Sequence, residues 1–252
     1  MPKFSIIIPT YEHAELLKRA LQSVIMQDFE DWEVIICDDS KSDSVKAYAE
    51  SMQDTRISYV KHDKGETAAE NWNFGLSKAQ GEHIILMHHD EAIVSPNHLS
   101  LIAQKMKENE VVISDVEVLY HGKKRHRLTT HLTQRFVSQH PKLLFFQNTI
   151  GPTACLAFRR NQMQLFNPHL TWFVDVEWYY RMLKGKQVLN YPTCRIQSIH
   201  GQEGQISQHL DVIKVFRKDK AILCKIYSGK IRLALWLYEH LILGTKKRLG
   251  KI

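Results

Sequence analysis

The chain has 252 residues, 44% of them apolar, so it is long enough to bury a full hydrophobic core in one domain built of two halves. Its four cysteines lie far apart without a Cys-x-x-Cys pair, which excludes a disulfide framework and a zinc-finger spacing and predicts reduced thiols in a cytosolic protein. The net charge of +7 leaves three classes of partner: nucleic acid, an anionic membrane surface, and anionic substrates such as nucleotide diphosphates.

The first third of the chain alternates between buried strands and helices. Phe4–Pro9 and Trp32–Cys37 are short apolar runs, typical of strands buried on both faces of a parallel sheet, and the residues at Leu16–Ile25 recur at helical spacing. The alternation continues with a helix at 45–52, a strand at 57–61, a helix at 67–79 and a strand at 83–87. We therefore predict an α/β fold with a doubly wound, mostly parallel sheet, whose ligands gather at the carboxyl ends of the strands.

The rest of the chain is less regular. The stretch 111–140 favours strands around a basic loop at 121–127, and a loop at 148–153 follows. From about residue 211 the chain is basic and helical, which predicts a C-terminal helical appendage. We expect three regions, 1–110, 111–210 and 211–252.

Two carboxylates, Asp38 and Asp39, directly follow the second predicted strand. Two interpretations are open. They hydrogen-bond to base and ribose hydroxyl donors, as an acidic residue at a strand end does in dinucleotide-binding folds. Alternatively, they start the next turn and cap the helix that follows it.

Four polar residues, His88–Glu91, follow the apolar strand at 83–87 and are presented at the sheet edge. Hard divalent cations prefer carboxylate oxygen, while imidazole suits softer transition metals. The mixed set indicates Mn²⁺ or Mg²⁺, held by few protein ligands and completed by phosphate oxygens. The alternative is a polar loop with chance histidines, because the chain contains 14 of them.

A further carboxylate, Asp175, lies on an aromatic-rich helical stretch at 172–180. Asp175 and Glu177 cannot share one helix face, and Arg181 is too far around the helix from Asp175 for a simple ion pair. One carboxylate is therefore left to face a cleft. The alternative is a helix start at which the helix dipole favours Asp175.

The order and approximate spacing of these features resemble the large inverting glycosyltransferase family 2, whose members have the GT-A fold. The similarity covers about residues 3–210. Phe4–Tyr11 resembles the family's first strand and nucleotide loop, and Gln27–Ser40 its second strand with the aspartate that contacts uridine. Asn71–Gly75 and Ala79–His83 look like the helix and the lead-in to the metal strand.

The resemblance implies roles for individual residues. The nucleotide contacts would come from Pro9, Thr10, Tyr11, Glu12, Asp38, Asp39 and Asn73. The ligands of a divalent cation, Mn²⁺ or Mg²⁺, would be Asp90, His89, Glu91 and His200. The catalytic base would be Asp175, and the acceptor side would be formed by Gly151, Pro152, Thr153, Glu177 and Trp178. This chain departs from the family's pattern because a single aspartate stands where the family usually has two or three.

The implied function is the transfer of one sugar from a nucleotide diphosphate sugar, with uridine as the favoured base, to an acceptor hydroxyl, with inversion, in cell-surface polysaccharide or lipid-linked glycan synthesis. Region 1–110 would bind the nucleotide sugar and region 111–210 the acceptor. The segment Ile199–Ser207 resembles the loop that closes over the diphosphate. The Gln-x-x-Arg-Trp signature of processive synthases is missing from the sequence, so we expect one sugar per encounter.

The region 211–252 predicts a basic amphipathic helix. Its apolar run Ile231–Leu243 is shorter than the ~20 residues that cross a bilayer, and lysines and arginines flank it. We expect a cytoplasmic protein attached peripherally to the inner face of the membrane, where lipid-linked acceptors reside. The alternative is a helix that packs on the sheet.

Other functions fit less well. A nucleotide-binding or regulatory protein that kept the fold and lost catalysis would explain the sparse acidic cluster at His89–Asp90, but Asp175 is retained. A dehydrogenase needs a Gly-x-Gly-x-x-Gly turn after the first strand, which this sequence lacks. Nucleic acid is not an expected partner, because the basic residues are not interleaved with aromatic residues on a recognisable module.

Overall fold

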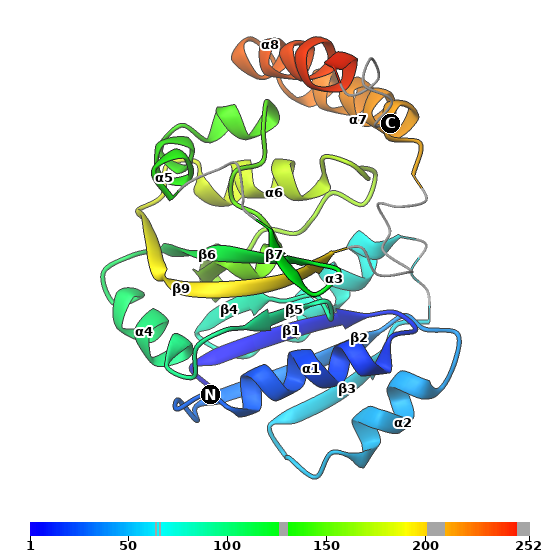
Figure 1. Cartoon of the computed structure of the whole chain (residues 1–252), viewed down its shortest axis with the longest axis vertical. Coiled ribbons are helices and arrows are strands. Elements are labelled where there is room, and N and C mark those ends of the chain that lie inside the picture. Colours follow the sequence, from blue (N-terminus) through cyan, green and yellow to red (C-terminus); the bar gives the residue numbers. More distant parts are fainter. Residues whose placement is uncertain (64, 66, 126–130, 201–209, 246–252) are drawn as a thin grey trace.

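The computed structural model describes residues 1–245 apart from 64, 66, 126–130 and 201–209. Its first half confirms the predicted alternation of strands and helices to within about two residues. The parallel strands are β1 (Phe4–Thr10), β2 (Trp32–Asp38), β3 (Ile57–Lys61) and β4 (His83–Leu86). The connecting helices are α1 (Ala14–Ile25), α2 (Ser44–Ser51) and α3 (Ala68–Lys78). The carboxyl ends of β1, β2 and β4 therefore meet at one edge (Figure 1).

The second half continues the same sheet with mixed pairing. Its strands are β5 (Glu91–Ile93), β6 (Val111–Tyr120), β7 (Lys123–Arg125), β8 (Leu156–Arg159) and β9 (Val188–His200). The order across the described strands is β3-β2-β1-β4-β8-β6-β9-β5, with β7 beside β6. β8 runs antiparallel to β4 and β6, whereas β9 runs parallel to β6 and antiparallel to β5. Helix α4 (His98–Lys105) follows β5. The first half therefore joins the second through β4 and β8.

The stretch after β7 corrects one expectation. Sequence favours strands as far as residue 140, but α5 (His131–Gln139) is a helix. Its buried side chains are Gln134, Val137 and Ser138, at a helical i, i+3, i+4 spacing. Two of these three residues are polar, so an apolar pattern does not reveal the buried face of this helix.

The C-terminal helices pack on α6 (Val174–Leu183), which Figure 1 shows between the sheet and these helices. They are α7 (Val212–Ile226), α8 (Lys230–Leu237) and the π-helical turn η5 (Tyr238–Leu243). An aromatic cluster joins them to α6 and to the short helix η1 (Pro141–Phe145), and it contains Phe145, Phe173, Tyr180, Phe216, Tyr227 and Tyr238. None of the helices in the described part of the chain has the length and apolarity needed to cross a bilayer.

Candidate active site

Asp38 stabilises the loop that follows β2. Its side chain is fully buried, and its carboxylate accepts hydrogen bonds from the Ser40 backbone N–H at 2.9 Å and from the Tyr59 hydroxyl at 2.8 Å. The Lys61 ammonium lies 3.5 Å from the same carboxylate. Of the two interpretations drawn from sequence, turn formation therefore describes Asp38.

Glu12 joins the loop after β1 to the loop after β2. Its carboxylate accepts hydrogen bonds from the backbone N–H groups of Lys41 at 2.6 Å and Ser42 at 3.2 Å. The hydroxyl of Ser42 and these N–H groups lower the pKa of Glu12. Its φ of 57° lies in the left-handed region, which non-glycine residues rarely adopt. The Glu12 carboxylate thus stabilises the loop through these hydrogen bonds.

The other polar groups at this edge are less constrained. Tyr11 is 47% exposed, and the Oγ1 of buried Thr10 has no hydrogen-bond partner among the described residues. The backbone N–H of Asp39 donates to the carbonyl of Thr10 at 3.1 Å, which places Asp39 next to them. Burial raises the pKa of the half-buried Asp39, and the nearby charge of His62 acts in the opposite direction. With Pro9, these are the groups that could contact a base and ribose.

Three side chains after β4 form a cluster with metal-ligand chemistry. The ligand atoms of His88, Asp90 and Glu91 all lie within 4.8 Å of one another. Glu91 is 3% exposed and accepts a hydrogen bond from the His88 backbone N–H at 3.0 Å. Burial, followed by the charge of Asp90, raises the pKa of Glu91 well above its ordinary value. Burial lowers the pKa of His88 to about 4, so its imidazole is neutral at physiological pH.

His89 does not belong to this cluster. Its ring lies beside that of His13, with centroids 5.5 Å apart, and its side chain hydrogen-bonds to the backbone of Pro9. The ligand set therefore contains His88 where the sequence-based expectation had His89. The reason is a turn at His88–Glu91: the Glu91 N–H donates to the His88 carbonyl at 3.0 Å, which brings these two residues together, while the His89 ring lies beside His13.

His200 ends β9 close to the cluster. The backbone N–H of its neighbour Ile199 donates to the Asp90 carbonyl at 3.0 Å. The His200 Nε2 atom lies 3.1 Å from the Ser198 hydroxyl. The expected diphosphate loop falls mostly on 201–209, which is outside the described residues.

Asp175 lies in the first turn of α6. Its Oδ1 atom is buried and has no hydrogen-bond partner in the described part of the chain. Burial raises the pKa of Asp175 to about 6. The charge of Asp175 also contributes to the raised pKa of Glu91, so Asp175 lies within electrostatic range of the cluster. The fold thus brings residues from β5 and α6 to one place.

The loop at 151–153 borders the same cluster. Gly151 has a φ of 110°, in a region that favours glycine, and its carbonyl accepts a hydrogen bond from the Tyr179 hydroxyl at 2.9 Å. Pro152 leads into Thr153, which is buried, and the next backbone N–H, that of Ala154, donates to Glu91. This loop therefore lies against Glu91, and its role on the acceptor side stays a prediction.

Three other expected site residues face the interior. Asn73 exchanges two hydrogen bonds with the Phe166 backbone, at 2.9 and 2.7 Å. Glu177 is 3% exposed and binds Arg181 at 2.7 Å. Trp178 is fully buried and stacks on Phe166 with centroids 4.5 Å apart. Because their side chains are satisfied inside the protein, these residues hold the segment around 166 and helix α6 rather than an open binding surface.

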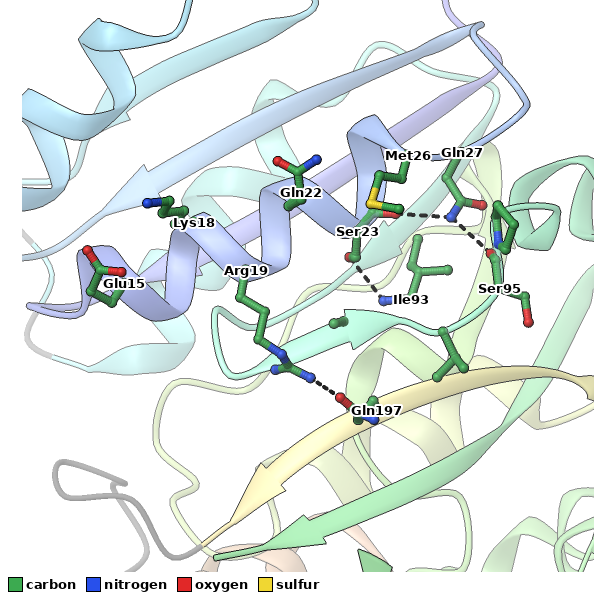
Figure 2. Close-up of a pocket in the computed structure, with 13 residues that line it drawn as sticks. Glu15, Lys18, Arg19, Gln22, Ser23, Met26, Gln27, Ile93, Ser95 and Gln197 are labelled. Atoms are coloured by element: carbon green, nitrogen blue, oxygen red, sulfur yellow. Dashed lines mark hydrogen bonds between the residues drawn. The ribbon is translucent and has the colours of Figure 1, made fainter. Parts of the chain in front are cut away.

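A cavity of about 540 Å³ lies between α1 and β5, beside the cluster (Figure 2). Figure 2 shows Arg19 reaching from α1 to a hydrogen bond with Gln197 on β9, and Ser23 accepting one from the Ile93 backbone N–H at 3.0 Å. The charge of Asp90 favours the charged form of Arg19, whose pKa burial lowers. None of the expected site residues lines this cavity. Its walls instead attach α1 to the edge strand that follows the metal-ligand cluster.

The donor set fits a divalent cation. Burial raises the pKa of Glu91 and of Asp175, and a bound cation would favour the ionised form of both carboxylates. The Nε2 atom of His88 is buried without a hydrogen-bond partner among the described residues, as is Oδ1 of Asp175. Carboxylate oxygen and neutral imidazole together suit Mn²⁺. Asp90 and His88, next to Glu91, are the residues that would hold the ion.

The family follows from sequence comparison. The family model described as Glycosyl transferase family 2 matches residues 5–166, which include the loops after β1 and β2 and the whole metal-ligand cluster. The chain belongs to this family. The match confirms the resemblance drawn from the sequence motifs.

Two relatives show the sequence similarity of this family 2 member to other glycosyltransferases. It is 37% identical over 111 residues to the GalNAc(5)-diNAcBac-PP-undecaprenol beta-1,3-glucosyltransferase of Campylobacter jejuni, a match that covers 43% of this chain and only 36% of that enzyme. It is 28% identical over 249 residues to WfgD of Escherichia coli, a UDP-Glc:alpha-D-GlcNAc-diphosphoundecaprenol beta-1,3-glucosyltransferase, covering 96% of this chain and 94% of WfgD.

Solved structures share the fold. The crystal structure of S. aureus TarS in complex with UDP-GlcNAc has a TM-score of 0.73 at 16% identity and covers 98% of this chain and 75% of that chain. The mannosyltransferase PcManGT from Pyrobaculum calidifontis, in complex with GDP-Man and Mn²⁺, has a TM-score of 0.67 at 16% identity and covers 100% and 76%. The predicted GT-A fold is confirmed.

Proposed function

We propose that this family 2 protein transfers a single sugar from a nucleotide diphosphate sugar to an acceptor hydroxyl, with inversion. The observation that carries the proposal is the Asp175 carboxylate, whose buried Oδ1 has no partner among the described residues and whose pKa burial raises to about 6. A carboxylate with this pKa is ionised at pH 7 and still basic enough to accept a proton from a reacting hydroxyl.

In the proposed reaction, Asp175 takes the proton of the acceptor hydroxyl while its oxygen attacks the anomeric carbon of the donor. The bond from that carbon to the diphosphate oxygen breaks, and the diphosphate leaves with the bonding electron pair. One displacement inverts the anomeric centre. General-base assistance of this kind typically contributes about 100- to 10,000-fold. The loop containing Gly151, Pro152 and Thr153 would border the acceptor.

A divalent cation, Mn²⁺ or Mg²⁺, would supply charge neutralisation for the leaving diphosphate when it is bound. Asp90 and His88 would hold it, next to Glu91. His200, at the end of β9, is an additional candidate for a phosphate or metal contact. The Mn²⁺ bound with GDP-Man in the structural relative PcManGT supports a metal-dependent site.

We propose a UDP-linked donor. Two relatives support this proposal: WfgD is named for UDP-Glc, and TarS binds UDP-GlcNAc. In this chain, Pro9, Thr10, Tyr11 and Asp39 provide the groups at the carboxyl ends of β1 and β2 that would contact the base and ribose. Asp38 and Glu12 would act indirectly, because their carboxylates hold the loops.

We further propose a lipid-linked glycan acceptor and a cytoplasmic protein held at the inner face of the membrane. Both relatives described above are named for undecaprenol-linked acceptors. On the C-terminal helices, Leu233 is 56% exposed and Trp236 is 49% exposed, close to the basic residues Lys230 and Arg232. Apolar side chains with a basic rim fit an anionic lipid surface. Trp236→Ser should weaken sedimentation with anionic vesicles and leave sedimentation with neutral vesicles unchanged.

The first experiment is calorimetric binding of UDP, dTDP and GDP, with and without Mn²⁺, to the wild type and to Asp90→Ala. We expect UDP binding that depends on Mn²⁺ and weakens at least about tenfold in the variant, which is a loss of about 1.4 kcal/mol. Glu108→Ala, an exposed acidic residue after α4, is the matched control and should bind UDP as the wild type does.

Failure to bind any of the three nucleotides would overturn the transferase proposal. The alternative of a GT-A protein with a regulatory role and impaired catalysis predicts a different result. It requires nucleotide binding with Mn²⁺ but no sugar transfer to any undecaprenol-linked acceptor, in the wild type and in Asp175→Asn alike.

A further inference from the structure

A buried carboxylate on α7 holds the segment that leads into α6. Asp219 is fully buried, and its Oδ2 atom accepts hydrogen bonds from the backbone N–H groups of Thr171 at 3.0 Å, Trp172 at 2.7 Å and Phe173 at 2.8 Å. The second oxygen, Oδ1, lies 3.1 Å from the same Thr171 N–H. One side chain from the C-terminal region therefore satisfies three consecutive backbone donors 46 to 48 residues earlier in the chain.

These donors immediately precede the candidate base. Phe173 is the N-cap residue of α6, and its own side chain makes no capping hydrogen bond. Asp175 follows two residues later, in the first turn. Asp219 thus provides the negative charge that the start of a helix attracts, from another element of the fold. Burial raises the pKa of Asp219, and the three backbone hydrogen bonds act in the opposite direction.

Further contacts bind the same two elements together. The indole N–H of Trp172 donates to the Tyr238 hydroxyl at 2.7 Å, and the ring of Phe173 lies 5.7 Å from that of Phe216. In the first turn of α6, the Tyr227 hydroxyl donates to Glu177 at 2.6 Å. The start of α6 is therefore held by side chains of α7 and η5.

We propose that Asp219 is a positioning residue for catalysis: by fixing the backbone at 171–173 it sets the place of the Asp175 carboxylate beside the metal-ligand cluster. This inference rests on the proposed role of Asp175 as the base. The C-terminal helices are then a working part of the catalytic half and not an appendage. A displacement of about 1 Å at a reacting group is enough to cost on the order of 100-fold in rate.

The test compares Asp219→Asn with Asp211→Asn. Both replace an aspartate of the same region by its amide, but Asp211 is exposed and caps its own helix, α7, by accepting a hydrogen bond from the Lys214 N–H at 3.0 Å. For each variant we would measure kcat, the affinity for UDP with Mn²⁺, and hydrogen exchange of peptides that cover residues 170–178, well below the unfolding temperature.

For Asp219→Asn we expect kcat to fall about 10- to 100-fold, UDP affinity to stay within about twofold, and exchange at 170–178 to become faster. Asp211→Asn should match the wild type in all three. Unchanged kcat in folded Asp219→Asn would overturn the proposal, and so would a parallel loss of UDP affinity, because that pattern indicates general damage to the fold.

Two provisions keep the outcomes separate. If Asp219→Asn does not fold, Tyr238→Phe removes only the hydroxyl that accepts from Trp172, and it should lower kcat in the same direction by a smaller factor; an unchanged kcat there counts against the proposal. If the wild type transfers no sugar, the proposed function fails. Independently of that result, unchanged hydrogen exchange at 170–178 in Asp219→Asn would show that Asp219 does not position α6.

Discussion

The carboxylates beside β2 and the carboxylate at the start of α6 have different surroundings. After β2, Asp38 accepts hydrogen bonds from Ser40 and Tyr59, and neighbouring Glu12 accepts two from backbone N–H groups. At the start of α6, in contrast, the buried Asp175 Oδ1 has no partner among the described residues, although Glu91 after β4 accepts hydrogen bonds from the backbone N–H groups of His88 and Ala154.

The difference separates carboxylates that stabilise the fold from carboxylates that remain available to a ligand. A buried acceptor with its donors in place contributes to stability, whereas a buried acceptor without them lowers it. Sites that give up stability in this way are typical of places where a substrate, a proton or a cation is bound. We therefore expect that substituting Asp175 mainly affects activity and that substituting Asp38 mainly affects stability.

The largest effect should come from Asp175→Asn. The amide has the same shape but cannot accept the proton of an acceptor hydroxyl, so turnover should fall about 100- to 10,000-fold while UDP binding is retained. Unfolding should occur at a higher temperature than in the wild type at pH 7.5, because the amide carries no charge to desolvate. Initial rates and thermal unfolding measure both, and wild-type turnover in the variant would refute the role of Asp175.

The pH dependence should report the same group. Burial raises the pKa of Asp175 to about 6, so the ionised base is lost below that pH and kcat should fall about tenfold per pH unit. The folded-state pKa lies above the ordinary value of 3.8, so its contribution to stability is full below pH 3.8 and is lost as the pH rises through 6. This pH-dependent loss of stability, measured on metal-free protein, should be smaller in Asp175→Asn.

Asp38→Asn tests a carboxylate whose hydrogen bonds are satisfied within the fold. In the variant, an NH₂ group would face donors that bind a carboxylate oxygen in the wild type. The free energy of unfolding should therefore fall by about 1 to 3 kcal/mol. Urea titration measures this loss. With saturating donor and acceptor, the folded variant should keep kcat within a few-fold of the wild type. A stability equal to that of the wild type would contradict the assignment of Asp38 to the fold.

The smallest effect should come from Tyr227→Phe. It removes the hydroxyl that donates to Glu177, but Arg181 continues to bind that carboxylate. The loss should be about 1 kcal/mol in urea titration, with little change in turnover. An effect on turnover as large as that of Asp219→Asn would mean that the whole contact between α6 and α7, and not the Asp219 carboxylate in particular, positions Asp175.

Sequence alone predicted the parallel half of the sheet because its signals are local. The runs in β1 and β2 are apolar without interruption, since both faces of each strand are covered, and such runs are readable without knowledge of neighbours. The strand at 83–87 was readable for the same reason, and it placed His88–Glu91 at the sheet edge from sequence alone.

Only the tertiary structure decided which polar side chains remain available. Asn73 and Trp178 are satisfied by the segment around residue 166, and Asp219 reaches back over 46 residues to the start of α6. Helix α5 was missed because polar Gln134 and Ser138 occupy its buried face. In each case the partner is distant in sequence, and hydrogen-bond satisfaction depends on the partner and not on the residue itself. The sequence therefore determined the family and the sheet edge, and the packing of distant segments determined which groups at that edge are left for chemistry.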